Sequence, residues 1–111
     1  MKYYTEEQSG KLRVALENQI LGWPYVTARR MFGCPAYSAE GRLFAFVVNE
    51  GIVLTQLRLR DRELLAEDLE TEPFVAGERE IERWTKVVTT PERLSRLMRY
   101  VQRSYDAALA H

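Results

Sequence analysis

The 111-residue chain is long enough to bury one hydrophobic core and too short for two, so we expect a single domain over residues 1–111. Its composition, 46% hydrophobic and 29% charged, excludes a chain that stays disordered for want of apolar surface. Sixteen basic residues balance sixteen acidic ones, so no overall field draws the protein to nucleic acid or to an anionic membrane.

The cysteine content and the length of the apolar runs indicate the cellular compartment in which the protein is expected. Cys34 is the only cysteine, which excludes an intramolecular disulfide and is typical of a reducing environment, so we expect a cytoplasmic protein. The first seven residues lack the apolar run of a secretory signal. The longest apolar run, residues 43–48, is too short to span a bilayer, so we expect no membrane association.

The chain begins with a predicted helix over residues 6–21. Thr5 and Gln8 have the spacing of a capping box. Apolar residues then recur every four positions, at Leu12, Leu16 and Ile20. This period places them on one helical face, which we expect to be buried.

Residues 28–59 change to short runs typical of β-strands. Three strands are predicted, over residues 28–37, 43–48 and 52–59. Gly33 and Pro35 interrupt the first strand, where a bulge or an edge position would tolerate them. We therefore expect a three-stranded antiparallel meander whose middle strand is covered on both faces.

The second half of the chain predicts two helices and two strands. A short helix over residues 61–69 would turn three leucines inward: Leu64, Leu65 and Leu69. Strands follow at residues 74–75 and 81–89, and Thr90 with Pro91 then starts a last helix. The predicted fold class is α+β: helix, three-stranded meander, helix, two strands and helix, with the helices packed on an antiparallel sheet.

Two segments resemble the N-terminal domain of the TfoX family. They are residues 29–33, Arg-Arg-Met-Phe-Gly, and residues 41–45, Gly-Arg-Leu-Phe-Ala. The later Glu72-Pro73-Phe74, the tryptophan-bearing strand and the proline-started helix agree, so the resemblance covers nearly the whole chain. It implies a fold grouped with secretion-chaperone-like domains and a bacterial role in transcription or competence regulation. It implies no catalytic residues, and the C-terminal helical domain that often follows in the family is not expected after His111.

The sequence offers no good general base and no nitrogen or sulfur metal cluster. The only histidine is His111, the last residue, and it cannot pair with Cys34 in a conventional metal site. We therefore expect no enzymatic activity, no metal and no cofactor. A carboxylate-only magnesium site among the acids of residues 61–72 is the alternative to a solvated helix face there.

Cys34 has two interpretations. Arg29 and Arg30 lie nearby in the sequence, and their positive charge would favour a reactive thiolate. The simpler interpretation is a small buried hydrophobic residue on a strand.

Arginine outnumbers lysine by thirteen to three, and its distribution is uneven. The last helix carries a basic stripe of four residues, Arg93, Arg96, Arg99 and Arg103. Residues 61–72 hold six acids and one base. The stripe is either water-facing charge or a docking surface for an acidic partner, including the acidic helix of a second copy.

A second candidate surface lies on the predicted sheet. Arginine and aromatic side chains could share one face suited to a planar or anionic ligand: Arg29, Arg30, Phe32 and Arg58. Four aromatic residues could instead line a small-molecule pocket or form the core: Trp23, Tyr25, Phe44 and Trp84.

Our leading hypothesis is a non-enzymatic regulatory or adaptor domain that binds a protein partner or itself. The alternative is weak nucleic-acid binding through the arginine patches.

Overall fold

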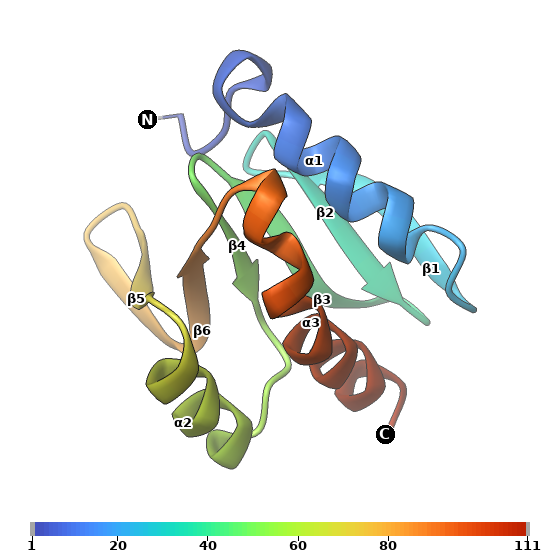
Figure 1. The fold of residues 1–111 in the computed structure, drawn as a ribbon, viewed down its shortest axis with the longest axis vertical. Helices are drawn as coiled ribbons and strands as arrows, with labels where there is room; N and C mark the ends of the chain where they lie inside the picture. The colour runs from blue at the N-terminus through green and yellow to red at the C-terminus, as the bar shows by residue number, and fades with distance from the viewer. Residues whose placement is uncertain (1, 111) are drawn as a thin grey trace.

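The computed structural model describes residues 2–110, which form three helices and one antiparallel sheet of six strands (Figure 1). In chain order the elements are α1 (Glu6–Ile20), β1 (Val26–Met31), β2 (Cys34–Ala39), β3 (Arg42–Val48), β4 (Gly51–Leu54), α2 (Leu59–Asp68), β5 (Thr71–Ala76), β6 (Arg79–Val88), the 3-10 helix η1 (Pro91–Arg93) and α3 (Leu94–Leu109). The strand order in the sheet is β1-β2-β3-β4-β6-β5. The predicted α+β class and the alternation of helices and strands are confirmed.

The first predicted strand consists of two strands, β1 and β2, joined by a hairpin. The turn lies at Phe32 and Gly33, whose φ angles are 55° and 77°. Two successive positive φ angles are typical of a two-residue type I′ turn. The meander therefore has four strands instead of the expected three, because an aromatic residue in the left-handed region gives no turn signal in the sequence.

A β-bulge interrupts the pairing of β2 with β3. Tyr37 pairs with Ala45, but the next residue of β2, Ser38, pairs with Leu43. Phe44 is thus an extra residue on β3 without a partner in β2. A bulge of this kind changes which face of the sheet the neighbouring side chains occupy.

The bulge allows two nearby phenylalanines to pack on different aromatic groups. In a regular strand, residues two apart point to the same face. Here Phe44 packs against Tyr105 of α3, with ring centroids 5.5 Å apart. Phe46 instead packs against Phe74 of β5 and Trp84 of β6, at 5.2 and 5.4 Å. Both phenylalanines are fully buried, so β3 is covered on both faces as predicted.

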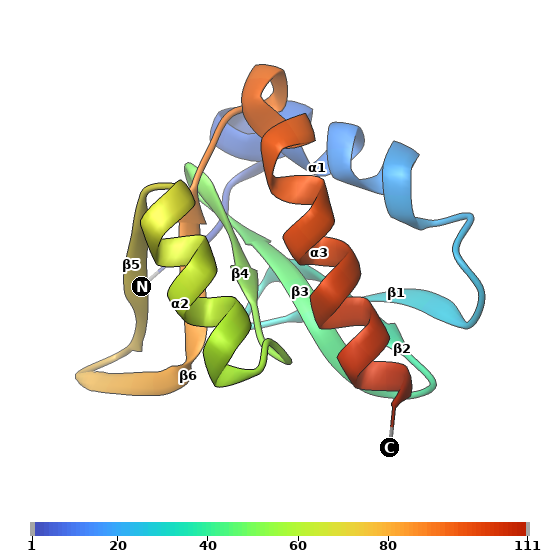
Figure 2. The same cartoon turned by 60° about the horizontal axis from the view of Figure 1, so that its bottom comes forward.

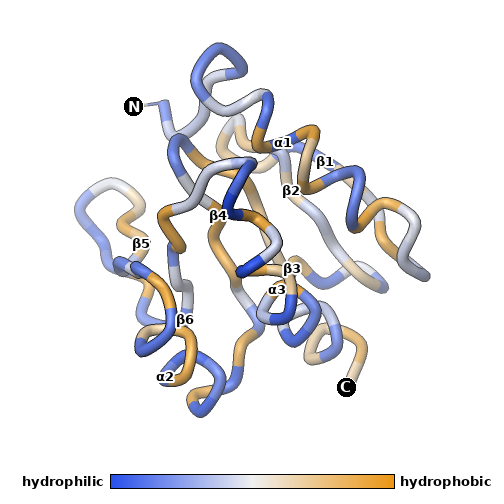
Figure 3. The backbone as a smooth tube through the Cα atoms, in the orientation of Figure 1, coloured by the Kyte–Doolittle hydropathy of each residue, from blue (hydrophilic) through white to orange (hydrophobic). Residues whose placement is uncertain are grey.

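Helices α1 and α3 cover one face of the sheet (Figures 1 and 2). The predicted stripe of α1 is buried, and Thr5 caps the helix by accepting a hydrogen bond from the Gln8 N–H at 3.4 Å. On α3, the Ser104 hydroxyl donates to the carbonyl of Phe44 at 2.7 Å and accepts from the Gln56 N–H at 3.1 Å. These contacts fix α3 on the apolar centre of the sheet that β3 and β4 form (Figure 3).

Helix α2 lies beside α3, where its aspartates meet the arginines of that helix (Figure 2). Of its three predicted inward leucines, Leu65 is fully buried, Leu69 is half-buried and Leu64 is 39% exposed. The prediction for Leu64 is wrong. The surface of α2 that packs against the rest of the protein is narrow, and it does not extend round the helix far enough to bury all three leucines.

The other face of the sheet carries no helix in the described chain (Figure 1). It is covered because the sheet curves until its two edges approach each other. Tyr3 packs between Phe32, in the β1–β2 turn, and Phe74 on β5, with ring centroids 6.1 and 5.6 Å away. Strands β1 and β5 are the two edges of the sheet, and in a flat sheet five spacings would separate them by about 24 Å. The Tyr3 hydroxyl also accepts a hydrogen bond from the Gly77 N–H at 2.9 Å. One side chain thus links both edges.

Among the described residues, 2–110, none of the helices has the length and apolar character needed to cross a membrane.

Gly51 of β4 pairs with Val88 of β6 and leaves no room for a Cβ atom beside that strand, which gives a test of the register. A Cβ atom at Gly51 would lie 2.5 Å from the carbonyl oxygen of Val87, a distance that forces the backbone to move. We expect Gly51→Ala to lower the free energy of unfolding by about 1–3 kcal/mol in urea denaturation. Gly22→Ala is the matched control, because a Cβ there meets nothing within 4 Å, and we expect a change within about 0.5 kcal/mol. Equal losses of unfolding free energy in Gly51→Ala and Gly22→Ala would contradict the pairing of β4 with β6 at this position.

Candidate functional site

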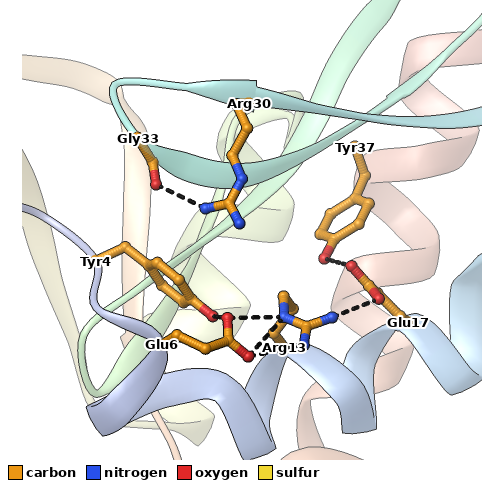
Figure 4. A network of polar contacts seen from close by, with 7 residues as sticks. All are labelled: Tyr4, Glu6, Arg13, Glu17, Arg30, Gly33 and Tyr37. Atoms are coloured by element: carbon orange, nitrogen blue, oxygen red, sulfur yellow. Dashed lines mark hydrogen bonds and ion pairs between the residues drawn. The ribbon is translucent and has the colours of Figure 1, made fainter.

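A polar network joins α1 to the N-terminal segment and to β2 (Figure 4). Arg13 forms ion pairs with Glu6 at 2.7 Å and with Glu17 at 2.9 Å. The other carboxylate oxygen of Glu17 accepts a hydrogen bond from the buried Tyr37 hydroxyl at 2.7 Å. The Tyr4 hydroxyl donates to Glu6 at 2.5 Å. Two tyrosines therefore hold Arg13 and its two acids in one arrangement.

The network shifts the pKa values of Glu6, Tyr37 and Tyr4. Hydrogen bonds from Arg13, and then from Tyr4, lower the pKa of Glu6 to about 2. Burial, and then the hydrogen bond to Glu17, raises the pKa of Tyr37. Burial also raises the pKa of Tyr4. A general acid or base at neutral pH needs a pKa near 7, so these three groups suit structural support better than proton transfer.

Arg29 and Arg30 lie next to this network. Both line a groove of about 540 Å³ between α1 and β1. The Arg30 guanidinium donates to the carbonyl of Gly33 at 3.0 Å and lies 5.8 Å from the Tyr4 ring centre. Phe32 is 57% exposed at the tip of the hairpin, where it contacts Tyr3.

Arg58 does not join the other members of the predicted sheet surface. Strand β4 ends at Leu54, earlier than the predicted residue 59, so Arg58 lies at the start of α2. It lines a separate cavity together with Arg62 and Arg83. The sequence missed this cavity because its three arginines come from α2, from β6 and from the connection between β4 and α2.

The basic stripe of α3 meets the acidic helix of the same chain. Arg99 pairs with Asp68, and Arg103 pairs with Asp61 at 2.7 Å. The Tyr100 hydroxyl also donates to Asp68, at 2.9 Å. The hydrogen bond from Arg99, followed by that from Tyr100, lowers the pKa of Asp68. Two of the four arginines of the predicted stripe are thus neutralised by aspartates of the same chain.

The other two arginines of the stripe are less engaged. Arg93 and Arg96 line a small cavity of about 110 Å³ with Asp68 and Glu70. Neither forms an ion pair within residues 2–110. An acidic partner for the whole stripe stays a prediction, and such a partner would have to compete with α2 for Arg99 and Arg103.

Cys34 is fully buried at the start of β2. Burial raises the pKa of its thiol to about 11, although the charge of Arg30 acts in the opposite direction. The Sγ atom lies 3.8 Å from the carbonyl oxygen of Phe32, to which it donates. A buried thiol with a raised pKa forms little thiolate, which favours the interpretation as a hydrophobic residue.

The four aromatic residues proposed for a small-molecule pocket do not share one environment. Phe44 is buried and packs on Tyr105, as does the half-buried Trp23. Trp84 belongs to a different cluster with Phe46 and Phe74. Tyr25 is 67% exposed. The core interpretation therefore applies to Phe44.

Within residues 2–110, which include the acids of residues 61–72, no group of three or more potential ligands is placed to hold a metal ion. His111, the one histidine considered in the sequence, lies outside the described residues.

A groove of about 1320 Å³ runs along α1 and was not predicted. Its other wall is the connection from β6 to η1, and the turn between β3 and β4 also contributes. Apolar residues line part of it: Leu12, Val14, Ala15, Val88 and Pro91. Four acids and one base also line it: Glu6, Glu7, Glu50, Glu92 and Lys11. We call this feature the acidic groove.

Comparison of the chain with protein-family models, with curated proteins and with solved structures finds no match in any of the three.

The depressed pKa of Glu6 predicts a specific loss of stability in acid. Its pKa falls from 4.5 to about 2 on folding, so the stabilisation is complete above pH 4.5 and is lost as the pH falls toward 2. We expect Glu6→Gln to be less stable than the wild type at neutral pH and equally stable near pH 2, in urea denaturation across this range.

The control is Glu7→Gln, because Glu7 is exposed and has no ion pair among the described residues. A Glu6→Gln deficit that stayed constant down to pH 2 would show that the ion pair with Arg13 does not cause it.

Proposed function

We propose that this protein is a non-enzymatic regulatory or adaptor domain that binds a segment of a partner protein in the acidic groove. The observation that carries the proposal is the combination of size, apolar lining and acidic charge in this one groove. A cavity lined by both apolar and charged groups offers burial for affinity and charge for orientation. Val14, in the middle of α1, is 45% exposed there, which leaves apolar surface for a partner to cover.

The charges of the groove favour a basic partner. Glu7, Glu50 and Glu92 form no ion pair within the described residues, and Lys11 is the one base in the lining. The chain as a whole is neutral, so this local excess is what would attract a positive segment. The matching ligand is a basic amphipathic segment, with apolar side chains against Val14 and Ala15 and with lysine or arginine beside the glutamates.

This partner differs from the acidic one that the sequence analysis gave as one interpretation of the α3 stripe. An acidic partner on α3 would have to displace Asp68 from Arg99 and Asp61 from Arg103. The unpaired glutamates of the acidic groove require no such displacement. Charge complementarity is therefore more readily available at the groove than at the α3 stripe.

The polar network supports the non-enzymatic part of the proposal. Glu6 is held ionised and Tyr37 is held protonated, so neither exchanges a proton near neutral pH. We further propose a TfoX-like regulatory domain acting in the cytoplasm. Support for this comes from residues 29–33 and 41–45, which lie at the β1–β2 turn and at the start of β3.

A fluorescein-labelled helical peptide of leucine and lysine, amphipathic and about 16 residues long, tests the proposal by fluorescence anisotropy. We expect saturable binding that weakens with salt. Reversing two groove charges, Glu50→Lys with Glu92→Lys, should weaken it about tenfold or more. The control is Glu63→Lys with Glu80→Lys, which reverses two exposed charges outside the groove and should change the affinity little.

Equal weakening by both double variants, or equal binding of a scrambled peptide without an apolar face, would overturn the proposal. Sedimentation of the protein alone provides a separate check. A dimer that the groove variant dissociates would assign the groove to a second copy and would also contradict a foreign partner.

A further inference from the structure

Three arginines meet at a cavity on the side of the molecule where α2 begins. The cavity has a volume of about 420 Å³, and its walls come from the β4–α2 connection, α2, β6 and the C-terminal end of α3. Arg58, Arg62 and Arg83 line it, and no acid among residues 2–110 belongs to its lining. We call it the arginine cavity.

The positive charge of the arginine cavity is not neutralised by the described part of the chain. None of the three arginines forms an ion pair within residues 2–110. The acid in the first turn of α2, Asp61, is already paired with Arg103. Three like charges around one cavity repel one another, and a bound anion would convert this repulsion into attraction.

The cavity is also partly organised for a ligand. Arg62 is half-buried, and one of its terminal nitrogens donates to the carbonyl of Leu57 at 3.0 Å, which orients the guanidinium. The remaining guanidinium N–H groups of Arg62 form no further hydrogen bond within residues 2–110. Arg58 and Arg83 are exposed, so a ligand can reach the cavity from solvent. Helix α2 has no side-chain cap, and its first amide groups add to the positive potential of the arginines.

The geometry points to a site for the phosphate group of a small molecule. Guanidinium groups bind phosphate oxygens through paired hydrogen bonds, and three of them suit a multiply charged anion better than a single carboxylate. The cavity is larger than one phosphate, so part of an attached group can enter with it. The described residues of its lining include no aromatic side chain on which a base could stack, which favours a small phosphate compound over single-stranded nucleic acid.

Isothermal titration calorimetry with pyrophosphate at constant ionic strength tests this site. We expect saturable binding of one pyrophosphate per chain and about tenfold weaker binding for Arg58→Gln and for Arg83→Gln. Both side chains are exposed, so these variants should fold. Arg29→Gln, which removes an exposed arginine from a different groove, is the matched control and should bind as the wild type does.

Thermal unfolding provides a second readout. Pyrophosphate should raise the Tm of the wild type and of Arg29→Gln, and it should raise that of the Arg58→Gln, Arg83→Gln double variant much less. Titration with a nucleoside monophosphate distinguishes a free phosphate ligand from one carried on an organic group, and binding of either supports the site.

Three results would overturn the inference. The first is the absence of saturable binding to the wild type, and the second is equal weakening by Arg29→Gln. The third is an affinity for single-stranded oligonucleotides that rises steadily with their length and far exceeds that for pyrophosphate, because it would assign the arginines to a nucleic-acid surface.

Discussion

Tyr3 packs between Phe32 and Phe74, which belong to the hairpins at opposite edges of the sheet. The helices of the described chain lie on one face of this sheet (Figure 1), yet its central strands are buried on both. Two features make this possible. The bulge at Phe44 directs neighbouring aromatic side chains into separate clusters, and the curl of the sheet brings both edges to Tyr3. The packing of the second face therefore depends on contacts between hairpins far apart in the sheet.

The surfaces that we assign to binding follow from the way the helices are fixed to this sheet. The network around Arg13 holds α1 in place, and the acidic groove runs between this helix and the β6–η1 connection. The pairs from Arg99 and Arg103 hold α2 against α3 and use two of its acids. The arginine cavity at the start of α2 is left without a paired acid in the described chain. A chain of zero net charge thereby presents two separate charged surfaces, the acidic groove and the arginine cavity.

Local patterns predicted the elements whose signals lie within one segment. The capping residue Thr5, the apolar stripe of α1 and the helical start at Thr90 and Pro91 are where the sequence placed them. The β1–β2 turn was missed because Phe32 occupies a conformation that glycine or asparagine usually adopts. The end of the third predicted strand was also placed too late, which put Arg58 on the sheet. The acidic groove and the arginine cavity draw on segments that only the tertiary fold brings together, so no spacing in the sequence marks them.

Amide hydrogen exchange of Tyr3→Ala beside Tyr3→Phe tests the closure of the sheet most directly. Tyr3→Ala removes the ring between the two edges and should lower the free energy of unfolding by about 2 kcal/mol, with faster exchange in both the β1–β2 and β5–β6 hairpins. Tyr3→Phe removes only the hydroxyl that accepts from Gly77, so the loss should be about 1 kcal/mol and confined to the β5–β6 hairpin. Unchanged exchange in both hairpins of Tyr3→Ala would contradict the account.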